Sequence, residues 1–186
     1  LNGYTRMNGD RRPEVIYPNT FRVLNQNEAG RELKRAQKLE MLVMDINKKI
    51  PKEIKDAFFG LVYFPVMAAA NLRKMNIYAG LNHYFAKENC ILANTFRELV
   101  NECIKMDQEL VRQYNEDMAA GKWKGMMSSN HVCFRSWNDE GWSYPETKEV
   151  KKTDTKEVFV FVEGSEHGHM AGEIDLPSFT STEKEN

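Results

Sequence analysis

The sequence is poor in cysteine and shows no disulfide pattern. Its three cysteines are Cys90, Cys103 and Cys133, an odd number without regular spacing. Disulfide-stapled domains carry an even, regularly spaced set. Cys90 and Cys103 are roughly four helical turns apart, so they cannot bond within one straight helix. We therefore expect free thiols that are buried or half-buried.

An excess of either charge is also missing, and so is a long apolar run. The chain has 26 basic and 27 acidic residues, a formal net charge of −1. Nucleic-acid binders usually carry a basic surplus or stripe, so we expect no nucleic-acid partner. The longest strongly apolar run, residues 58–70, is shorter than the roughly 20 residues that cross a bilayer and contains Pro65. We therefore expect no membrane partner.

Several motifs that carry chemistry are absent. There is no Gly-rich phosphate loop, no Gly-x-Ser-x-Gly elbow and no ferritin-like pattern of glutamates with paired Glu-x-x-His motifs. His167 and His169 lie near Glu163 and Glu166, but a metal site needs three or four converging ligands. Fortuitous spacing on a Gly-containing segment is the better interpretation. We expect no metal site and no cofactor.

The sequence does contain a long helical pattern over residues 53–85. Apolar or small residues recur there at intervals of four and three, which places them on one face of a helix. A second row widens this stripe, so more than one neighbour must cover the helix. We predict a central helix, kinked at Pro65 because proline lacks a backbone donor. The stripe consists of Ile54, Phe58, Leu61, Pro65, Ala68, Leu72, Met75 and Ala79, and the second row of Ala57, Val62, Val66 and Ala69.

Two further segments repeat the same spacing. The first begins at Asn25 or Asn27, either of which can cap a helix, and ends near Ile50, before Pro51. The second covers residues 88–120 and is followed by Gly121, because glycine suits the position directly after a helix. Their expected core residues are Ala29, Leu33, Ala36, Leu39, Val43, Ile46 and Ile50 in the first, and Leu92, Phe96, Leu99, Cys103, Met106, Leu110 and Gln113 or Tyr114 in the second.

These segments predict a mainly α fold, an antiparallel up-down-up bundle of three long helices. Residues 1–24 are expected to form an irregular, extended lead-in. Residues 25–145 are the bundle with an aromatic-rich cap, and residues 146–186 are a linker and the start of a truncated β domain. The run at 158–162 is β-branched and aromatic, so the chain should end in one or two strands. A single strand cannot bury itself, so it must join a sheet outside this chain or pair with the lead-in.

The aromatic segment after Gly121 allows two interpretations. Trp123, Trp137 and Trp142 lie within twenty residues. Indole rings can stack on the flat apolar faces of sugars, or they can cap the open end of a helical bundle. Because aromatic burial dominates core energetics, we favour the cap.

The order of several motifs resembles glycoside hydrolase family 115. The resemblance runs through most of the chain and is most specific in the middle, where rare side chains recur in order. The matching segments are Arg12-Pro13-Glu14, residues 25–29, residues 56–66 followed by Ala70-Asn71-Leu72, Tyr114-Asn115, Gly121-Lys122-Trp123, Met126-Met127, His131, Trp137, Val162-Glu163-Gly164-Ser165 and Leu176-Pro177-Ser178-Phe179.

Members of that family are xylan α-1,2-glucuronidases, which release (4-O-methyl)glucuronic acid from glucuronoxylan. A TIM-like barrel holds their catalytic carboxylates, and a helical bundle and a β-sandwich follow it. The resemblance implies that this chain corresponds to the bundle and the start of the sandwich, so it implies no catalytic residue here. Substrate-facing or barrel-facing side chains are expected at Trp123, His131, Arg135 and Trp137.

The resemblance also implies partners and a place of action. The partners are the catalytic barrel and the β-sandwich of the same parent chain, glucuronoxylan through that parent, and a second copy in a homodimer. The parent is expected in the periplasm or outside the cell. The chain begins with Leu1 and shows no signal peptide, and we expect it to be part of a longer protein. The alternative function is a stand-alone carbohydrate- or protein-binding module that acts through residues 123–142.

Overall fold

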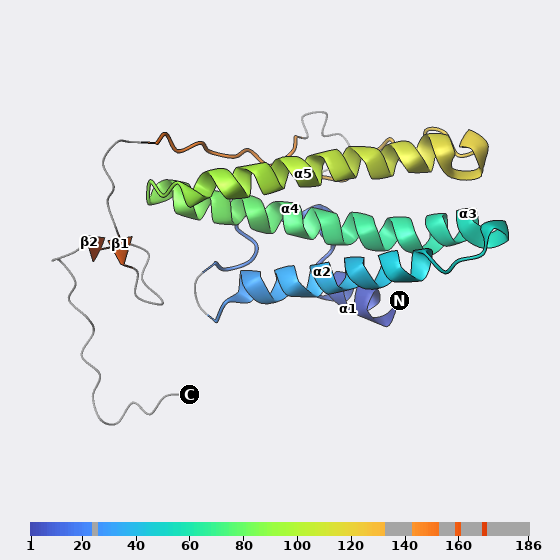
Figure 1. Cartoon of the computed structure of the whole chain (residues 1–186), viewed down its shortest axis with the longest axis horizontal. Coiled ribbons are helices and arrows are strands. Elements are labelled where there is room, and N and C mark those ends of the chain that lie inside the picture. The colour runs from blue at the N-terminus through green and yellow to red at the C-terminus, as the bar shows by residue number, and fades with distance from the viewer. Residues whose placement is uncertain (24–25, 133–142, 153–158, 161–168, 171–186) are drawn as a thin grey trace, which may run out of the picture.

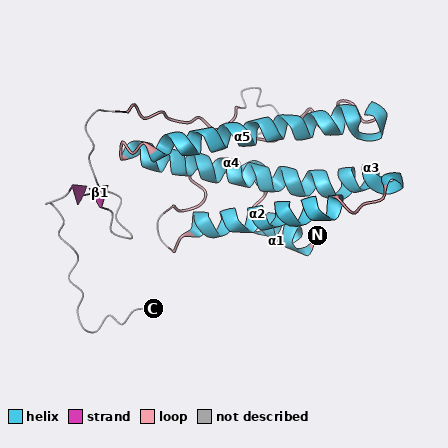
Figure 2. Ribbon diagram, in the orientation of Figure 1, coloured by secondary structure: helices cyan, strands magenta, loops and turns pink. Residues whose placement is uncertain are grey.

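The computed structural model describes residues 1–23, 26–132, 143–152, 159–160 and 169–170. Helices dominate these residues (Figures 1 and 2), and the prediction of a mainly α chain is confirmed. The long helices are α2 (Glu28–Asn47), α4 (Phe64–Lys87) and α5 (Leu92–Arg112). They cover most of the two flanking segments and the central segment that the periodicity predicts.

Helix α4 is the centre of the arrangement. It lies between α2 and α5 and contacts both (Figure 1). Its buried residues are spread around the helix rather than along one stripe, because neighbours cover it on more than one side. One cluster joins Leu72 and Met75 to Val100 and Cys103 of α5. Another joins Val66 and other residues of α4 to α2 and α5 at the opposite end.

The prediction of an irregular lead-in is wrong for its first part. Residues Asn2–Asp10 form helix α1, and Pro13–Val15 form the 3-10 turn η1. Met7 is fully buried against Ala36 of α2 and against Ala69 and Ala70 of α4, with Tyr4 packed beside it. Small side chains on α2 and α4 allow this close approach. The weak local pattern of polar residues and two glycines is therefore overridden by tertiary packing.

A buried arginine fixes this N-terminal segment. The side chain of Arg73 is 1% exposed and forms an ion pair with Glu32 of α2. Its Nη2 donates to the carbonyl oxygen of Met7 at 2.7 Å and to that of Arg11 at 3.1 Å. Its guanidinium also lies 5.2 Å from the ring centroid of Phe21. Burial lowers the pKa of Arg73, against the opposing effect of Glu32, and these contacts compensate part of the desolvation of the charge.

The segment before α4 is irregular in a way that the sequence pattern did not anticipate. It consists of η2 (Lys52–Ile54), α3 (Lys55–Phe58) and the π-helical η3 (Phe59–Tyr63), and Pro65 follows near the start of α4. A proline has no N–H for the carbonyl four residues before it, and a π-helical turn accommodates that loss. A wider turn also shifts the phase of the stripe. Leu61, which the stripe assigns to the core, is therefore 77% exposed.

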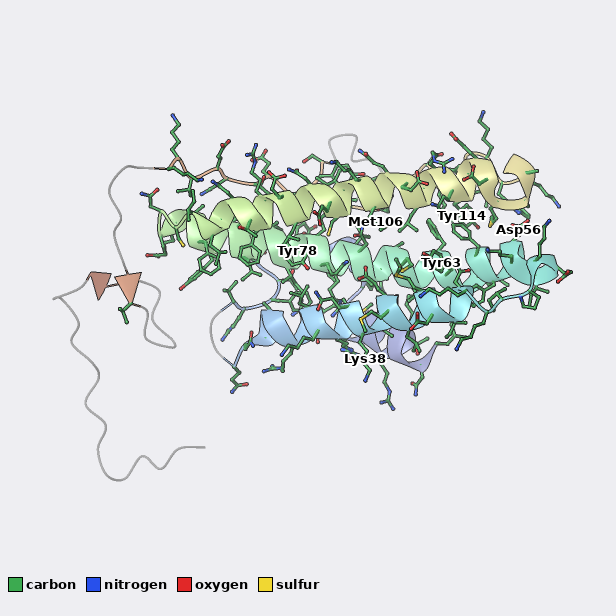
Figure 3. All side chains as sticks on the ribbon, viewed as in Figure 1. Lys38, Asp56, Tyr63, Tyr78, Met106 and Tyr114 are labelled. Atoms are coloured by element: carbon green, nitrogen blue, oxygen red, sulfur yellow. The ribbon has the colours of Figure 1, made fainter. Side chains whose placement is uncertain are left out.

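Helix α5 ends earlier than predicted. It starts at Leu92 because Asn89, with φ of 51°, is in the left-handed region after α4. At the other end, η4 (Gln113–Asp117) is π-helical and η5 (Met118–Gly121) contains left-handed residues. The Asp56 carboxylate accepts a hydrogen bond from the amide of Ala119 at 3.2 Å and joins α3 to η5. Figure 3 labels Asp56 and Tyr114 at this end of the helices.

The predicted cap of α2 is correct in place but wrong in mechanism. Asn27 is the N-cap residue, but it is in the left-handed region and its side chain makes no capping hydrogen bond.

Two short strands, β1 (Phe159–Val160) and β2 (His169–Met170), pair antiparallel with Phe159 opposite Met170. The rest of the predicted run at 158–162 lies outside the described residues.

The free thiols Cys90, half-buried, and Cys103, buried, agree with expectation, and Cys133 lies outside the described residues.

Candidate functional site

A buried carboxylate on α5 collects the polar contacts of the aromatic-rich region. The side chain of Asp107 is 3% exposed. His131 Nε2 lies 3.0 Å from each of its oxygens, and the hydroxyl of Tyr144 donates to Oδ2 at 2.8 Å. These three residues come from α5, from the loop after η5 and from the extended segment 143–152. Asp107 therefore ties both segments to the same helix.

The geometry around His131 fixes its charge. Its second ring nitrogen, Nδ1, lies 3.1 Å from the carbonyl oxygen of Ser129. A carbonyl and a carboxylate are both acceptors, so both ring nitrogens must carry hydrogen to satisfy them. The hydrogen bond to Asp107 raises the pKa of His131, while burial opposes it. The pKa of Tyr144 is raised as well, first by burial and then by Asp107.

This arrangement limits the chemistry that His131 can perform. A general base or a metal ligand needs a ring nitrogen with a free lone pair. In this geometry Nε2 is directed at Asp107 and Nδ1 at Ser129. The charged imidazolium suits an electrostatic and positioning role better than proton transfer. The geometry therefore favours a structural role for Asp107, His131 and Tyr144 over a catalytic dyad. We call these three residues the latch.

Two hollows flank the latch. A cavity of about 240 Å³ lies between Tyr4 of α1, Phe64 of α4 and Leu110 of α5. A second, more open cavity of about 270 Å³ lies towards Tyr144. Asp107 and His131 line both. They are the only charged side chains that border the first cavity among the described residues, and the rest of its wall is mostly apolar.

The loop that carries His131 is shaped by a second polar residue. Asn115 Oδ1 accepts hydrogen bonds from the amides of Gly125 at 3.1 Å and Met127 at 3.0 Å. Its Nδ2 donates to the carbonyl oxygen of Met127 at 3.2 Å. Gly125 has φ of 87°, a conformation that favours glycine. Asn115 therefore satisfies backbone groups of this loop, which pairs with no strand in the described residues.

The described part of the structure contains two of the four predicted site residues, His131 and Trp123. His131 lies in the latch. Trp123 lies in the turn after η5, is 41% exposed, and has Lys122 Nζ at 5.1 Å from its ring centroid. Arg135 and Trp137 lie outside the described residues, as does Trp142. That Trp123, His131, Arg135 and Trp137 face the substrate or the barrel stays a prediction.

Sequence reasoning missed Asp107 although a signal was present. The predicted seam placed Met106 in the core, but Met106 is 42% exposed and Asp107 is buried instead. Asp107 lies four residues after Cys103 and three before Leu110, so it shares their face of the helix. A lone aspartate in this phase is usually taken for part of a solvated charged face. Its partners, His131 and Tyr144, are too distant in sequence to be recognised as such.

Within the described ranges, no group of three or more His, Cys, Asp or Glu side chains is arranged to hold a metal. Glu163, Glu166 and His167 lie outside these ranges. No described helix combines the length and the hydropathy that a membrane span requires. No protein-family model and no curated protein sequence matches the chain.

Proposed function

We propose that this chain is a non-catalytic helical scaffold within a longer glycoside hydrolase that resembles the xylan α-1,2-glucuronidases. In this proposal α2, α4 and α5 act as an antiparallel up-down-up bundle. The bundle packs on a catalytic barrel and carries a β domain, of which residues 146–186 are the linker and the start. The parent protein would release (4-O-methyl)glucuronic acid from glucuronoxylan.

The observation that carries the proposal is an unusually apolar exposed stretch. The second half of α2 and the segment after it expose large hydrophobic side chains, although such residues are normally scattered singly on a monomer surface. An interface with another domain or a second copy would cover them. The exposed residues are Met41, Leu42, Met44, Ile46, Ile54 and Leu61.

The polar cluster gives a second, weaker support. Asp107, His131 and Tyr144 are engaged with each other and with the backbone. Groups used in this way position segments of the chain rather than act on a substrate. This agrees with a scaffold whose catalytic carboxylates belong to another domain.

An activity assay tests the first part of the proposal. The chain alone is incubated with aldouronic acids, and released glucuronic acid is measured. We expect no release, and detectable release that persists through purification would refute a non-catalytic role. The coding sequence upstream of Leu1 is the matching test of the parent. It should encode roughly 250 residues or more with alternating strand and helix patterns, whereas an initiator Met directly before Leu1 would refute it.

Sedimentation velocity tests the exposed apolar stretch. We expect self-association that rises with protein concentration, because about 25 cal/mol is gained for each Å² of apolar surface removed from water. The double variant Met41→Lys and Leu42→Lys should shift the chain towards monomer. Lys38→Ala is the matched control, since Lys38 is exposed on the same helix (Figure 3). A wild type that stays monomeric at all concentrations would contradict an interface on this stretch.

The alternative, a binding module, is favoured by one observation. Trp123 is 41% exposed although a capping role would bury it. A flat, accessible indole is the kind of group on which a sugar ring stacks. Affinity electrophoresis on glucuronoxylan separates the two proposals. A pure scaffold runs unretarded, whereas a binding module is retarded and loses that retardation in Trp123→Ala.

A further inference from the structure

The segment 143–152 is held against the helices through its backbone. It forms no helix, and no strand lies beside it in the described residues. Figure 1 shows it, in orange, running along α5. An extended chain without a sheet partner must still satisfy its N–H and C=O groups. In this protein, side chains of α4 and α5 bind those groups.

Asn82 of α4 forms a closed pair with Lys148. Its Oδ1 accepts from the amide of Lys148 at 2.7 Å, and its Nδ2 donates to the carbonyl oxygen of Lys148 at 2.9 Å. The same Nδ2 donates to the carbonyl oxygen of Ala93 at 2.8 Å. Asn82 is fully buried. A primary amide presents one acceptor and two donors, and here all of them are used.

The pattern repeats at alternate residues. Asn94 of α5 accepts from the amide of Val150 at 2.9 Å and donates to its carbonyl oxygen at 2.8 Å. His83 Nε2 donates to the carbonyl oxygen of Glu146 at 2.7 Å. Residues 146, 148 and 150 share one side of an extended chain, whose period is two. We call Asn82, His83 and Asn94 the amide clamp.

The amide clamp binds main-chain groups, which every peptide carries. Side-chain contacts of the segment are concentrated at its two ends. Tyr144 reaches Asp107, and Val150 is buried. Between them Arg97 pairs with Glu149 at 3.1 Å, but both side chains are substantially exposed, so this pair adds little. The helices therefore present what the edge of a β-sheet presents to an added strand.

We propose that α4 and α5 form a receptor for an extended peptide backbone, and that its ligand is residues 143–152 of this chain. The amide clamp fixes the register, and Tyr144 and Val150 anchor the two ends. The receptor binds this segment whether it is covalently attached or supplied by a second copy. This inference goes beyond the scaffold role and does not depend on the identity of the parent enzyme.

Peptide binding in trans tests the proposal. The probe is a fluorescein-labelled peptide of residues 143–152, and the receptor is the full chain carrying Val150→Asp, which weakens the attached segment. In the wild type the attached segment competes at an effective concentration of about millimolar. We therefore expect the peptide to bind the variant at least about tenfold tighter than the wild type, as fluorescence anisotropy would measure. Circular dichroism checks that the variant is folded.

Backbone methylation distinguishes main-chain from side-chain recognition. A peptide N-methylated at Lys148 lacks the amide hydrogen that Asn82 accepts but keeps every side chain. It should bind at least about tenfold more weakly. Peptides with Ala at Thr147 or Glu149 should bind within about twofold of the parent. Absence of binding to the folded variant, or binding that methylation leaves unchanged, would overturn the proposal.

Amide hydrogen exchange of the unmodified full chain gives a test that no variant can compromise. The amides of Lys148 and Val150 should be protected, and those of Thr147 and Glu149, for which the described structure shows no acceptor, should exchange at least about tenfold faster. Exchange would be followed by NMR. Equal protection of all four amides, or of none, would overturn recognition at alternate residues. Asn82→Ala should remove protection at Lys148, and unchanged protection there would contradict the clamp.

Discussion

Removal of His131 should destabilise the chain in a pH-dependent way. His131 links the loop after η5 to the buried carboxylate of Asp107. His131→Ala deletes this link and leaves the carboxylate with Tyr144 as its remaining partner in the described structure. The free energy of unfolding should fall because a buried charged acceptor loses its strongest donor.

The size of the loss can be worked from the contacts. A hydrogen bond to a charged group contributes about 1.5–3 kcal/mol, and the lower half of this range applies because the His131 side chain is 34% exposed and solvent screens it. The bond to the carbonyl of Ser129 adds about 1 kcal/mol. The expected total is about 3 kcal/mol. At about 2–4 °C for each kcal/mol in a chain of this size, Tm should fall by about 6–12 °C.

The sign of the pH dependence follows from the raised pKa of His131. Its contribution is complete below the unfolded pKa of about 6.5 and is lost as the pH rises through the higher folded pKa. Urea unfolding, followed by circular dichroism, should therefore show a larger difference between wild type and His131→Ala at about pH 5.5 than at about pH 9. A double-mutant cycle with Asp107→Asn isolates the pairwise energy.

Lys105→Ala is the matched control, because Lys105 is an exposed residue of α5, the helix that carries Asp107. It should change the free energy of unfolding by at most about 0.5 kcal/mol. A His131→Ala effect no larger than this control would show that the latch does not stabilise the fold. An effect of equal size at both pH values would show that His131 is not charged in the native state.

Three further predictions concern the core. Gly80→Ala places a Cβ 2.2 Å from the carbonyl oxygen of Pro18 and should lower the free energy of unfolding, measured by urea titration, by about 1–3 kcal/mol. The control Gly9→Ala, with open space around it, should be neutral or stabilising by up to about 1 kcal/mol. Equal effects of the two variants would contradict the close packing at Gly80. Burial raises the pKa of Cys103 to about 12, so iodoacetamide should leave Cys103 unmodified in the native chain near neutral pH, and mass spectrometry that finds rapid labelling would contradict its burial. Met75→Ala, at a fully buried position, should lower the free energy of unfolding by about 2–5 kcal/mol, and a loss under about 1 kcal/mol would show that the site collapses around the cavity.

The helices could be predicted because they depend on local periodicity. The spacing of four and three placed Ala36, Val43, Leu72, Met75 and Cys103 in the core, and they are buried. The spacing fails inside α5, where Met106 is exposed and Asp107 is buried, and also where the backbone departs from the regular helix. The π-helical η3 shifts the phase before Pro65, so the stripe assigned Leu61 to the wrong face.

Helix α1 could not be predicted because its stability is tertiary. Its sequence contains Gly3 and Gly9 and shows no strong apolar stripe. What holds the segment is Met7 among the alanines of its neighbours and the contact between Arg73 and the carbonyl oxygen of Met7. Arg73 is far from α1 in the sequence. Its position in a helix with many apolar residues gave no hint of this partner.

The polar residues of the candidate site and of the amide clamp were missed for a related reason. Asp107 and Asn94 of α5 and Asn82 of α4 are single polar residues in long helices, and such side chains are usually exposed to solvent. Their partners are loop residues or backbone groups at a sequence distance that periodicity cannot detect. Of the predicted residues, His131 was identified by resemblance alone, and its partner Asp107 was not.

The amide clamp also bears on the solubility of the chain. An extended segment with unpaired N–H and C=O groups is a template for pairing with other chains, and natural sheet proteins protect such edges with charges, bulges or covering elements. Here the side-chain amides of Asn82 and Asn94 form hydrogen bonds with the inward-facing backbone groups of Lys148 and Val150. A helical surface thus shields an extended segment from aggregation without requiring a sheet, and the cost is one fully buried asparagine, Asn82, and one half-buried asparagine, Asn94.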